Sequence, residues 1–148
     1  MASERRLVLE TTATSAPVGN VRVLVVEDEP TISQVCERVL GRKGYAVTLV
    51  CDGQAAQSLL LTESFDICLI DIRTPRMSGE QLFEWISVNR PELTGGIILT
   101  TGDTISSDTA KFLAAAGRPT LPKPFAPADL LEIVESVTAG WNYATNQS

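Results

Sequence analysis

The stretch VRVLVVEDEP, residues 21–30, joins a predicted strand to a group of acids. Five of its first six residues are aliphatic, which is typical of a strand buried on both faces of a parallel sheet. Glu27, Asp28 and Glu29 follow at once, and like charges this close repel one another. These ten residues leave two explanations open. The acids can begin a solvated helix in which Pro30 suits the first turn, or a bound cation can turn the repulsion into ligation.

Composition narrows the class of protein. The chain has 148 residues, the size of one domain, and its 12 basic and 18 acidic side chains give a net charge of −6. This charge argues against a nucleic-acid partner, which needs a basic stripe. Residues 1–19 are rich in Ser, Thr and Ala and are expected to form a flexible leader or linker. Because the sequence has no signal peptide and no apolar run of membrane length, we expect a cytoplasmic protein without membrane contact.

Histidine is absent, which excludes Ser-His-Asp and Cys-His catalysis and the common zinc sites. The three cysteines, Cys36, Cys51 and Cys68, form no CxxC pair and are expected to be reduced thiols. Chemistry in this chain therefore depends on carboxylates, hydroxyls, lysine and a hard cation.

Apolar periodicity predicts five strands that alternate with five helices. This alternation is typical of an α/β domain, here residues 20–140, with a parallel sheet and helices on both faces. Residues 141–148 are expected to be a frayed polar tail. In such a sheet the functional crevice lies at the carboxyl ends of the strands. The predicted strands are 21–26, 45–50, 66–70, 96–100 and 120–121, and the helices are 30–42, a segment around Leu59, a segment around Leu82, 106–116 and 127–139.

Polar side chains follow these strands at the predicted crevice. Glu27 and Asp28 follow the first strand, Asp71 follows the third, Thr101 the fourth and Lys123 the fifth. Three carboxylates without histidine suit Mg²⁺, which prefers oxygen ligands. A lysine and a hydroxyl beside them suit a phosphoryl group. One carboxylate could then attack phosphorus and form an aspartyl phosphate.

This arrangement resembles the receiver domain of two-component response regulators. The spacing agrees with that family, because Thr101 and Lys123 follow Asp71 by 30 and 52 residues. The resemblance implies a flavodoxin-like (βα)5 doubly wound sheet with strand order 2-1-3-4-5. The matching motifs are Glu27-Asp28, LID ending at Asp71, TG at Thr101-Gly102 and KPF at 123–125, within residues 21 to about 139.

The resemblance also implies a role for each matching residue. Asp71 would accept the phosphoryl group in a Mg²⁺-dependent reaction, with Mn²⁺ as an alternative ion. Asp28 and Asp71 would ligate the ion directly, together with the backbone carbonyl of Arg73. Glu27 would bind through water or at the edge of the site. Lys123 would pair first with the Asp71 carboxylate and then with a phosphoryl oxygen.

Other positions would shape the site or depart from the family pattern. Thr101 would donate a hydrogen bond to the phosphoryl group, Gly102 would keep the approach open, and Pro124 would follow a cis bond. Thr120 stands where many receivers have Tyr or Phe, so the usual aromatic switch is expected to be muted or different. Glu29 is expected only to begin the first helix.

Two charged residues, Arg73 and Asp103, flank the predicted phosphorylation site. They lie two residues after Asp71 and Thr101, at positions that tune the access of water in receivers. We expect an Arg73–Asp103 pair to shield the acyl phosphate and lengthen its lifetime.

The implied function is a signalling switch rather than a conventional enzyme. The phosphoryl group would come from a phosphohistidine on a histidine kinase or a histidine phosphotransfer protein, and the chain would hydrolyse its own aspartyl phosphate. A phosphatase of the haloacid dehalogenase type is a weaker alternative, because it needs a second Asp where this chain has Arg73. A receiver-like interaction module that is never phosphorylated is the other alternative. The sequence leaves open whether the chain is a stand-alone receiver or a fragment of a hybrid sensor kinase. It also leaves open whether the chain forms a homodimer.

Overall fold

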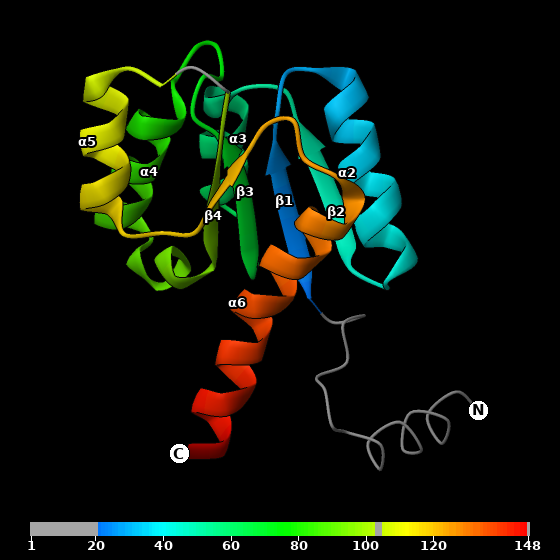
Figure 1. Cartoon of the computed structure of the whole chain (residues 1–148). Coiled ribbons are helices and arrows are strands. Elements are labelled where there is room, and N and C mark those ends of the chain that lie inside the picture. The colour runs from blue at the N-terminus through cyan, green and yellow to red at the C-terminus, as the bar shows by residue number, and fades with distance from the viewer. Residues whose placement is uncertain (1–20, 103–104, 148) are drawn as a thin grey trace.

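Five parallel strands form the centre of the structure. The computed structural model describes residues 21–102 and 105–147, with side chains as far as Trp141. The strands lie in the order β2-β1-β3-β4-β5, as predicted (Figure 1). They are β1 (Arg22–Val26), β2 (Ala46–Val50), β3 (Ile67–Asp71), β4 (Ile97–Thr101) and β5 (Thr120–Pro122).

Helices cover both faces of this sheet. The order of strands reverses after β2, so right-handed crossovers place the first helix on one face and the next three on the other. The last helix follows the last strand and packs on the same face as the first. The predicted doubly wound α/β fold is thus confirmed. The first face carries α2 (Pro30–Arg42) and α6 (Pro127–Gln147), and the second carries α3 (Gly53–Leu60), α4 (Gly79–Asn89) and α5 (Ser107–Ala116).

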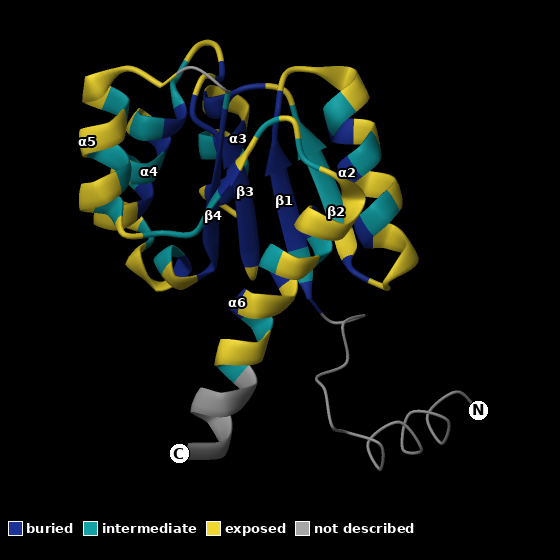
Figure 2. Cartoon of the chain, in the orientation of Figure 1, coloured by how far each residue is buried: buried dark blue, intermediate teal, exposed yellow. Residues whose placement is uncertain are grey.

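The central strands are buried because they are covered on both sides. Both β3 and β4 are buried along their whole length, and Figure 2 shows them with β1 in the colour of buried residues. Successive side chains point to opposite faces of a sheet, so Leu24 and Val25 of β1 enter two different cores. This double coverage explains why the strands have nearly continuous apolar sequences.

Two elements differ from the prediction. The predicted end of the last helix near Ala139 is wrong, because α6 continues to Gln147. Trp141 is half-buried against the core beneath α2 and α6, which gives this polar segment an apolar contact. A 3-10 helix, η2 (Pro91–Gly96), was not predicted and leads the chain from α4 into β4.

Two further predictions concern the leader and a membrane-spanning helix. The predicted leader, residues 1–19, lies outside the described residues. Within the ranges that are described, no helix is both long enough and apolar enough to cross a membrane.

Candidate functional site

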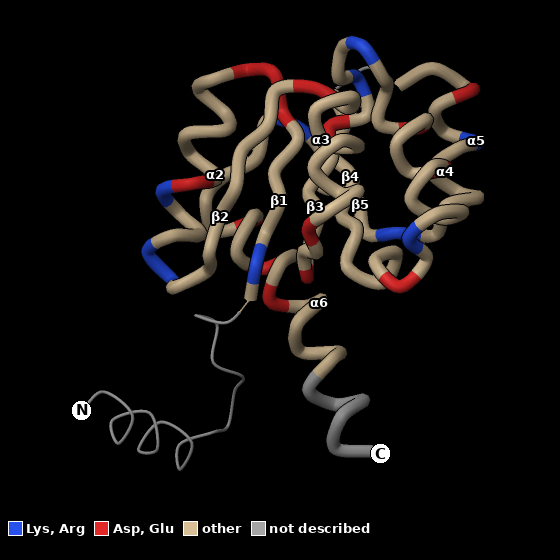
Figure 3. Tube along the Cα trace, turned by 180° about the vertical axis from the view of Figure 1, so that it is seen from behind, with Lys and Arg blue, Asp and Glu red and all other residues tan. Residues whose placement is uncertain are grey.

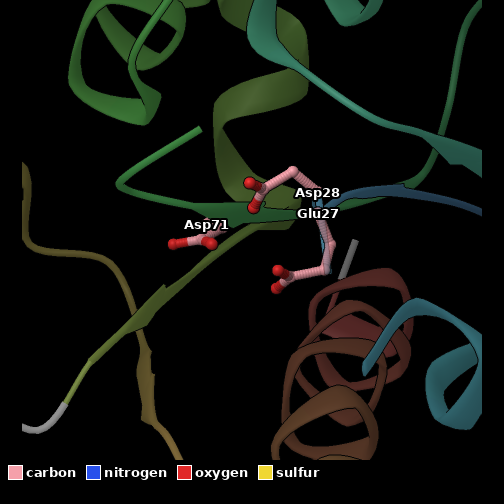
Figure 4. A group of neighbouring side chains, drawn as sticks. All are labelled: Glu27, Asp28 and Asp71. Atoms are coloured by element: carbon pink, nitrogen blue, oxygen red, sulfur yellow. The ribbon is translucent and has the colours of Figure 1, made fainter. Parts of the chain in front are cut away.

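The ends of β1 and β3 bring three acids together. Glu27 and Asp28 follow β1, and Asp71 is the last residue of β3. Val26 and Ile70 are partners in the register of these neighbouring strands, so both strands end at the same edge. One carboxylate oxygen of each acid lies within 4.8 Å of the others, and Figure 4 shows the three side chains gathered at this edge. We call Glu27, Asp28 and Asp71 the acidic cluster.

Lys123 supplies the positive charge next to this cluster. It follows β5, and its backbone N–H donates to the carbonyl of Thr101 at 2.7 Å, which fixes it beside the end of β4. Its Nζ lies 2.9 Å from a carboxylate oxygen of Glu27 and 3.0 Å from one of Asp71. A third carboxylate oxygen, from Glu29, lies 3.2 Å away. One ammonium therefore contacts three acids.

Burial and charge determine the protonation of these groups. Burial, together with the charge of Asp71, raises the pKa of Glu27 to about 7 despite the hydrogen bond from Lys123. Burial alone would lower the pKa of Lys123, but its hydrogen bonds with Glu27 and Asp71 outweigh that effect and raise the pKa. Lys123 therefore stays charged, but the acids around it outnumber this single positive charge. Figure 3 shows acidic segments where the chain passes from β1 to α2. Such an excess of carboxylates favours a bound divalent cation.

Both carboxylate oxygens of Asp71 have hydrogen-bond donors. The backbone N–H of Arg73 donates to Oδ1 at 3.0 Å, and Nζ of Lys123 donates to Oδ2 at 3.0 Å. Behind the side chain, a Cβ at Gly79 would come within 2.6 Å of the Asp71 carbonyl oxygen, so this close approach requires glycine. The carboxylate is thus held in one orientation. It lines a cleft of about 500 Å³ with Asp28, Glu29, Ile32, Arg73, Gly102, Lys123 and Pro124.

The Thr101 hydroxyl is buried and has no hydrogen-bond partner among the described residues. Thr101 ends β4 and lines a small recess with Arg73 and Gly102, both of which also line the cleft. The hydroxyl of Thr100 is likewise unpaired, but alternation along β4 directs it to the other face of the sheet. A buried hydroxyl without a partner costs free energy, so Thr101 fits a ligand that enters the cleft and accepts a hydrogen bond from it.

The remaining predicted site residues lie on the same edge of the sheet or next to it. An ideal Cβ at Gly102 would meet no described heavy atom within 4 Å, and the role of this glycine stays a prediction. The Lys123–Pro124 bond is cis, as predicted. Thr120 is half-buried in β5, where its hydroxyl lies 3.4 Å from the carbonyl oxygen of Arg118. Asp103 lies outside the described residues, so its pairing with Arg73 stays a prediction.

Sequence reasoning missed four contributors to this edge. Glu29 begins α2 as expected, but its side chain also reaches Lys123, and no sequence pattern indicates that contact. Thr74 is buried and bonds within the loop after Asp71, and Arg76 of that loop pairs with Asp52. For Asp52 a signal was present, since an Asp directly before a helix is a common N-cap.

Relatives of known family agree with this geometry. The family model of the response regulator receiver domain matches residues 23–135. The transcriptional regulatory protein DltR of Streptococcus agalactiae serotype III (strain NEM316) is 33% identical over 111 residues, which are 75% of this chain and 49% of that protein. The chain thus spans about half the length of the curated relatives it matches.

Solved structures agree as well. A CheY-like response regulator receiver domain protein from Methanospirillum hungatei JF-1 has a TM-score of 0.75 and 28% identity, with 84% of this chain and 98% of that chain covered. The receiver domain of a sensor histidine kinase from Pseudomonas aeruginosa PAO1 has a magnesium ion coordinated in its active site cleft. It has a TM-score of 0.71 and 31% identity, with 80% and 98% covered. Fold, site and relatives together establish that this chain belongs to the receiver domain family of two-component response regulators.

Proposed function

We propose that this chain accepts a phosphoryl group on Asp71 from a phosphohistidine, in a Mg²⁺-dependent reaction. Receiver domains interact with histidine kinases or phosphotransfer proteins, and either would be the donor here. One observation carries the proposal. Asp71 is a buried carboxylate with both oxygens held, and it faces a cleft beside Lys123 and near the unpaired hydroxyl of Thr101.

The acidic cluster fits a divalent cation. Its three carboxylate oxygens lie within 4.8 Å of one another, and carboxylates are the ligands that Mg²⁺ and Mn²⁺ prefer. Asp28, Asp71 and the backbone carbonyl of Arg73 would hold the ion, with Glu27 bound through water or at its edge. When bound, the ion supplies positive charge that neutralises the oxygens of the phosphoryl group during transfer.

The side chains around Asp71 would orient the transfer. An Asp71 oxygen attacks phosphorus, the new P–O bond forms as the P–N bond of the donor breaks, and the electron pair stays on the imidazole nitrogen. The ammonium of Lys123 then turns from the carboxylate to a phosphoryl oxygen. Thr101 donates a hydrogen bond from its hydroxyl to another phosphoryl oxygen and so gains a partner, which it lacks among the described residues.

Loss of the phosphoryl group would return the chain to its first state. Water attacks phosphorus, the P–O bond to Asp71 breaks, and inorganic phosphate leaves. The chain therefore acts as a switch with a limited lifetime rather than as a conventional enzyme. We expect the rearrangement around β5 to be muted, because Thr120 is too small for the swing that an aromatic side chain makes.

Intact mass spectrometry tests this proposal. The protein is incubated with Mg²⁺ and either acetyl phosphate or phosphoramidate, whose P–N bond imitates phosphohistidine, with and without EDTA. We expect a gain of one phosphoryl group that requires Mg²⁺ and is lost in Asp71→Asn. Asp66→Asn is the matched control, because Asp66 immediately precedes β3 at the far end of the strand from Asp71.

Three results would contradict the proposal. A mass gain that survives Asp71→Asn would assign the phosphoryl group to another residue. No gain with either small donor or with a phosphorylated histidine phosphotransfer protein would favour a receiver-like interaction module that is not phosphorylated. Sustained hydrolysis of a phosphate ester would instead indicate a phosphatase.

A further inference from the structure

The β3–α4 loop, residues 72–78, is held by a charged pair that the proposed chemistry does not use. Asp52 lies between β2 and α3, and its Oδ2 accepts hydrogen bonds from Arg76 Nε at 3.0 Å and Nη2 at 2.7 Å. Its Oδ1 accepts the backbone N–H of Ala55 at 2.8 Å and so caps α3. The Ala55 N–H and the Arg76 guanidinium hold the pKa of Asp52 below its usual range. One charged carboxylate thus joins the start of α3 to the loop that follows Asp71.

The backbone of the same loop packs closely against α3. A Cβ at Gly53 would overlap the carbonyl oxygen of Met77, so only glycine fits at the first position of this helix. The N–H of Gly53 donates to the carbonyl of Pro75 at 3.4 Å, and the buried hydroxyl of Thr74 donates to the carbonyl of Met77 at 2.7 Å. The loop therefore has no room to move toward α3, and the Asp52–Arg76 pair opposes movement away from it.

Arg76 has a backbone conformation that disfavours arginine. Its φ of 63° lies in the left-handed region, which glycine adopts freely and other residues adopt at a cost. Its side chain is 65% exposed, and an ion pair this open to water stabilises a fold only slightly. A gain in fold stability therefore explains poorly why residue 76 is an arginine. The need to hold the loop in place explains it.

The held loop carries backbone groups into the proposed site. The N–H of Arg73 donates to Oδ1 of Asp71, and Arg73 lines the cleft beside the acidic cluster. The far end of the loop is fixed by the N–H of Gly79, which donates to the carbonyl of Ile72 at 2.8 Å. Between these two points the Asp52–Arg76 pair is a charged side-chain contact that ties the loop to the start of α3.

We propose that Asp52 and Arg76 are positioning residues, which fix the β3–α4 loop so that the Arg73 carbonyl is set to ligate the divalent cation. This inference rests on the proposed function. A backbone carbonyl cannot be re-aimed by rotating a side chain, so its contribution to ion affinity depends on a loop that is ordered before the ion arrives. Groups that orient metal ligands typically change metal affinity by about 10- to 100-fold when they are removed.

Direct measurement of Mn²⁺ binding tests the inference without any phosphoryl transfer. Electron paramagnetic resonance of free Mn²⁺ gives the dissociation constant, and competition gives the value for Mg²⁺. Asp52→Asn keeps an N-cap on α3 because Asn caps helices well, but it removes the charge. We expect the dissociation constant to rise about tenfold.

Arg76→Gly separates positioning from stability. Glycine adopts the left-handed φ freely, so the melting temperature should stay the same or rise, whereas the dissociation constant should again rise about tenfold. The double variant should match either single variant, because both remove the same interaction. Amide hydrogen exchange of residues 72–78 in the absence of metal should be faster in both variants.

A matched control removes another arginine–carboxylate pair at the opposite edge of the sheet. Glu63→Gln breaks the Arg22–Glu63 pair, whose atoms lie 2.7 Å apart, and should leave ion affinity unchanged. Unchanged affinity in Asp52→Asn and Arg76→Gly, with normal binding by the wild type, would overturn the positioning role alone. A melting temperature of Arg76→Gly that falls in parallel with its affinity would also overturn it. Failure of the wild type to bind Mn²⁺ would instead overturn the proposed function.

Discussion

Replacing Glu27 with Gln is expected to stabilise the ion-free protein at neutral and alkaline pH. The side chain is buried, and burial raises its pKa to about 7 from an ordinary value of 4.5. The native state therefore binds more protons than the unfolded chain between these two pH values. The contribution of Glu27 to the free energy of unfolding therefore falls as the pH rises from about 4.5 to about 7.

The size of this effect follows from the pKa. The full difference corresponds to about 3 kcal/mol. Because the cleft beside Glu27 is open to water, which screens the charge, we expect about 2 kcal/mol in practice. The carboxylate accepts from Lys123 with one oxygen and from the backbone N–H of Glu29 with the other, so the single amide oxygen of Glu27→Gln keeps one of these two hydrogen bonds. The substitution thus removes the charge and one hydrogen bond.

Urea unfolding with EDTA at about pH 4, 6 and 8 measures the difference between the two proteins. The wild type should lose about 2 kcal/mol relative to the variant over this range, because titrations common to both cancel. A saturating divalent cation should narrow the gap, since the wild type offers the ion one more charged ligand. A gap that is constant with pH, or a variant that is less stable at pH 8, would refute the reasoning.

Three other changes give measurable results. Thr101→Val should raise the free energy of unfolding by about 1 kcal/mol in urea, because it removes an unpaired buried hydroxyl, and it should slow phosphorylation at least about tenfold in intact-mass time courses. Gly53→Ala should lower stability by about 2 kcal/mol, because its Cβ would overlap a carbonyl oxygen. Gly41→Ala, on an open part of α2, should raise it by about 0.5 kcal/mol, and thermal melts compare the two. Cys51 is exposed and should react with a thiol reagent in the native protein, whereas the two buried thiols should react only after unfolding.

Much of the site could be predicted because it lies at strand ends. Asp71, Thr101 and Lys123 each follow an apolar run, and parallel strands of one sheet end at the same edge. The contact between Glu29 and Lys123 could not be predicted. It depends on the direction of an exposed side chain at the start of a helix, which periodicity does not specify.

Long-range packing accounts for the other differences. Gly140 and the polar residues after it favour the end of a helix, but Trp141 packs on the core and α6 continues. The left-handed φ of Arg76 also could not be predicted, because this conformation usually requires glycine and an arginine does not indicate it. In both cases a contact with a distant part of the chain decides the local structure.

The site draws on four strands of one sheet, and the strand that precedes Lys123 is the last in the chain. Domains fold as their chains emerge during synthesis, from the N-terminus onward. Asp71 is therefore made well before the ammonium that orients it. A nascent chain that ends before β5 carries the acids without their cation, and their repulsion opposes the close approach of β1 and β3 at this edge. We therefore expect β5 both to complete the sheet and to bring Lys123 to Asp71 when it joins the newly made chain.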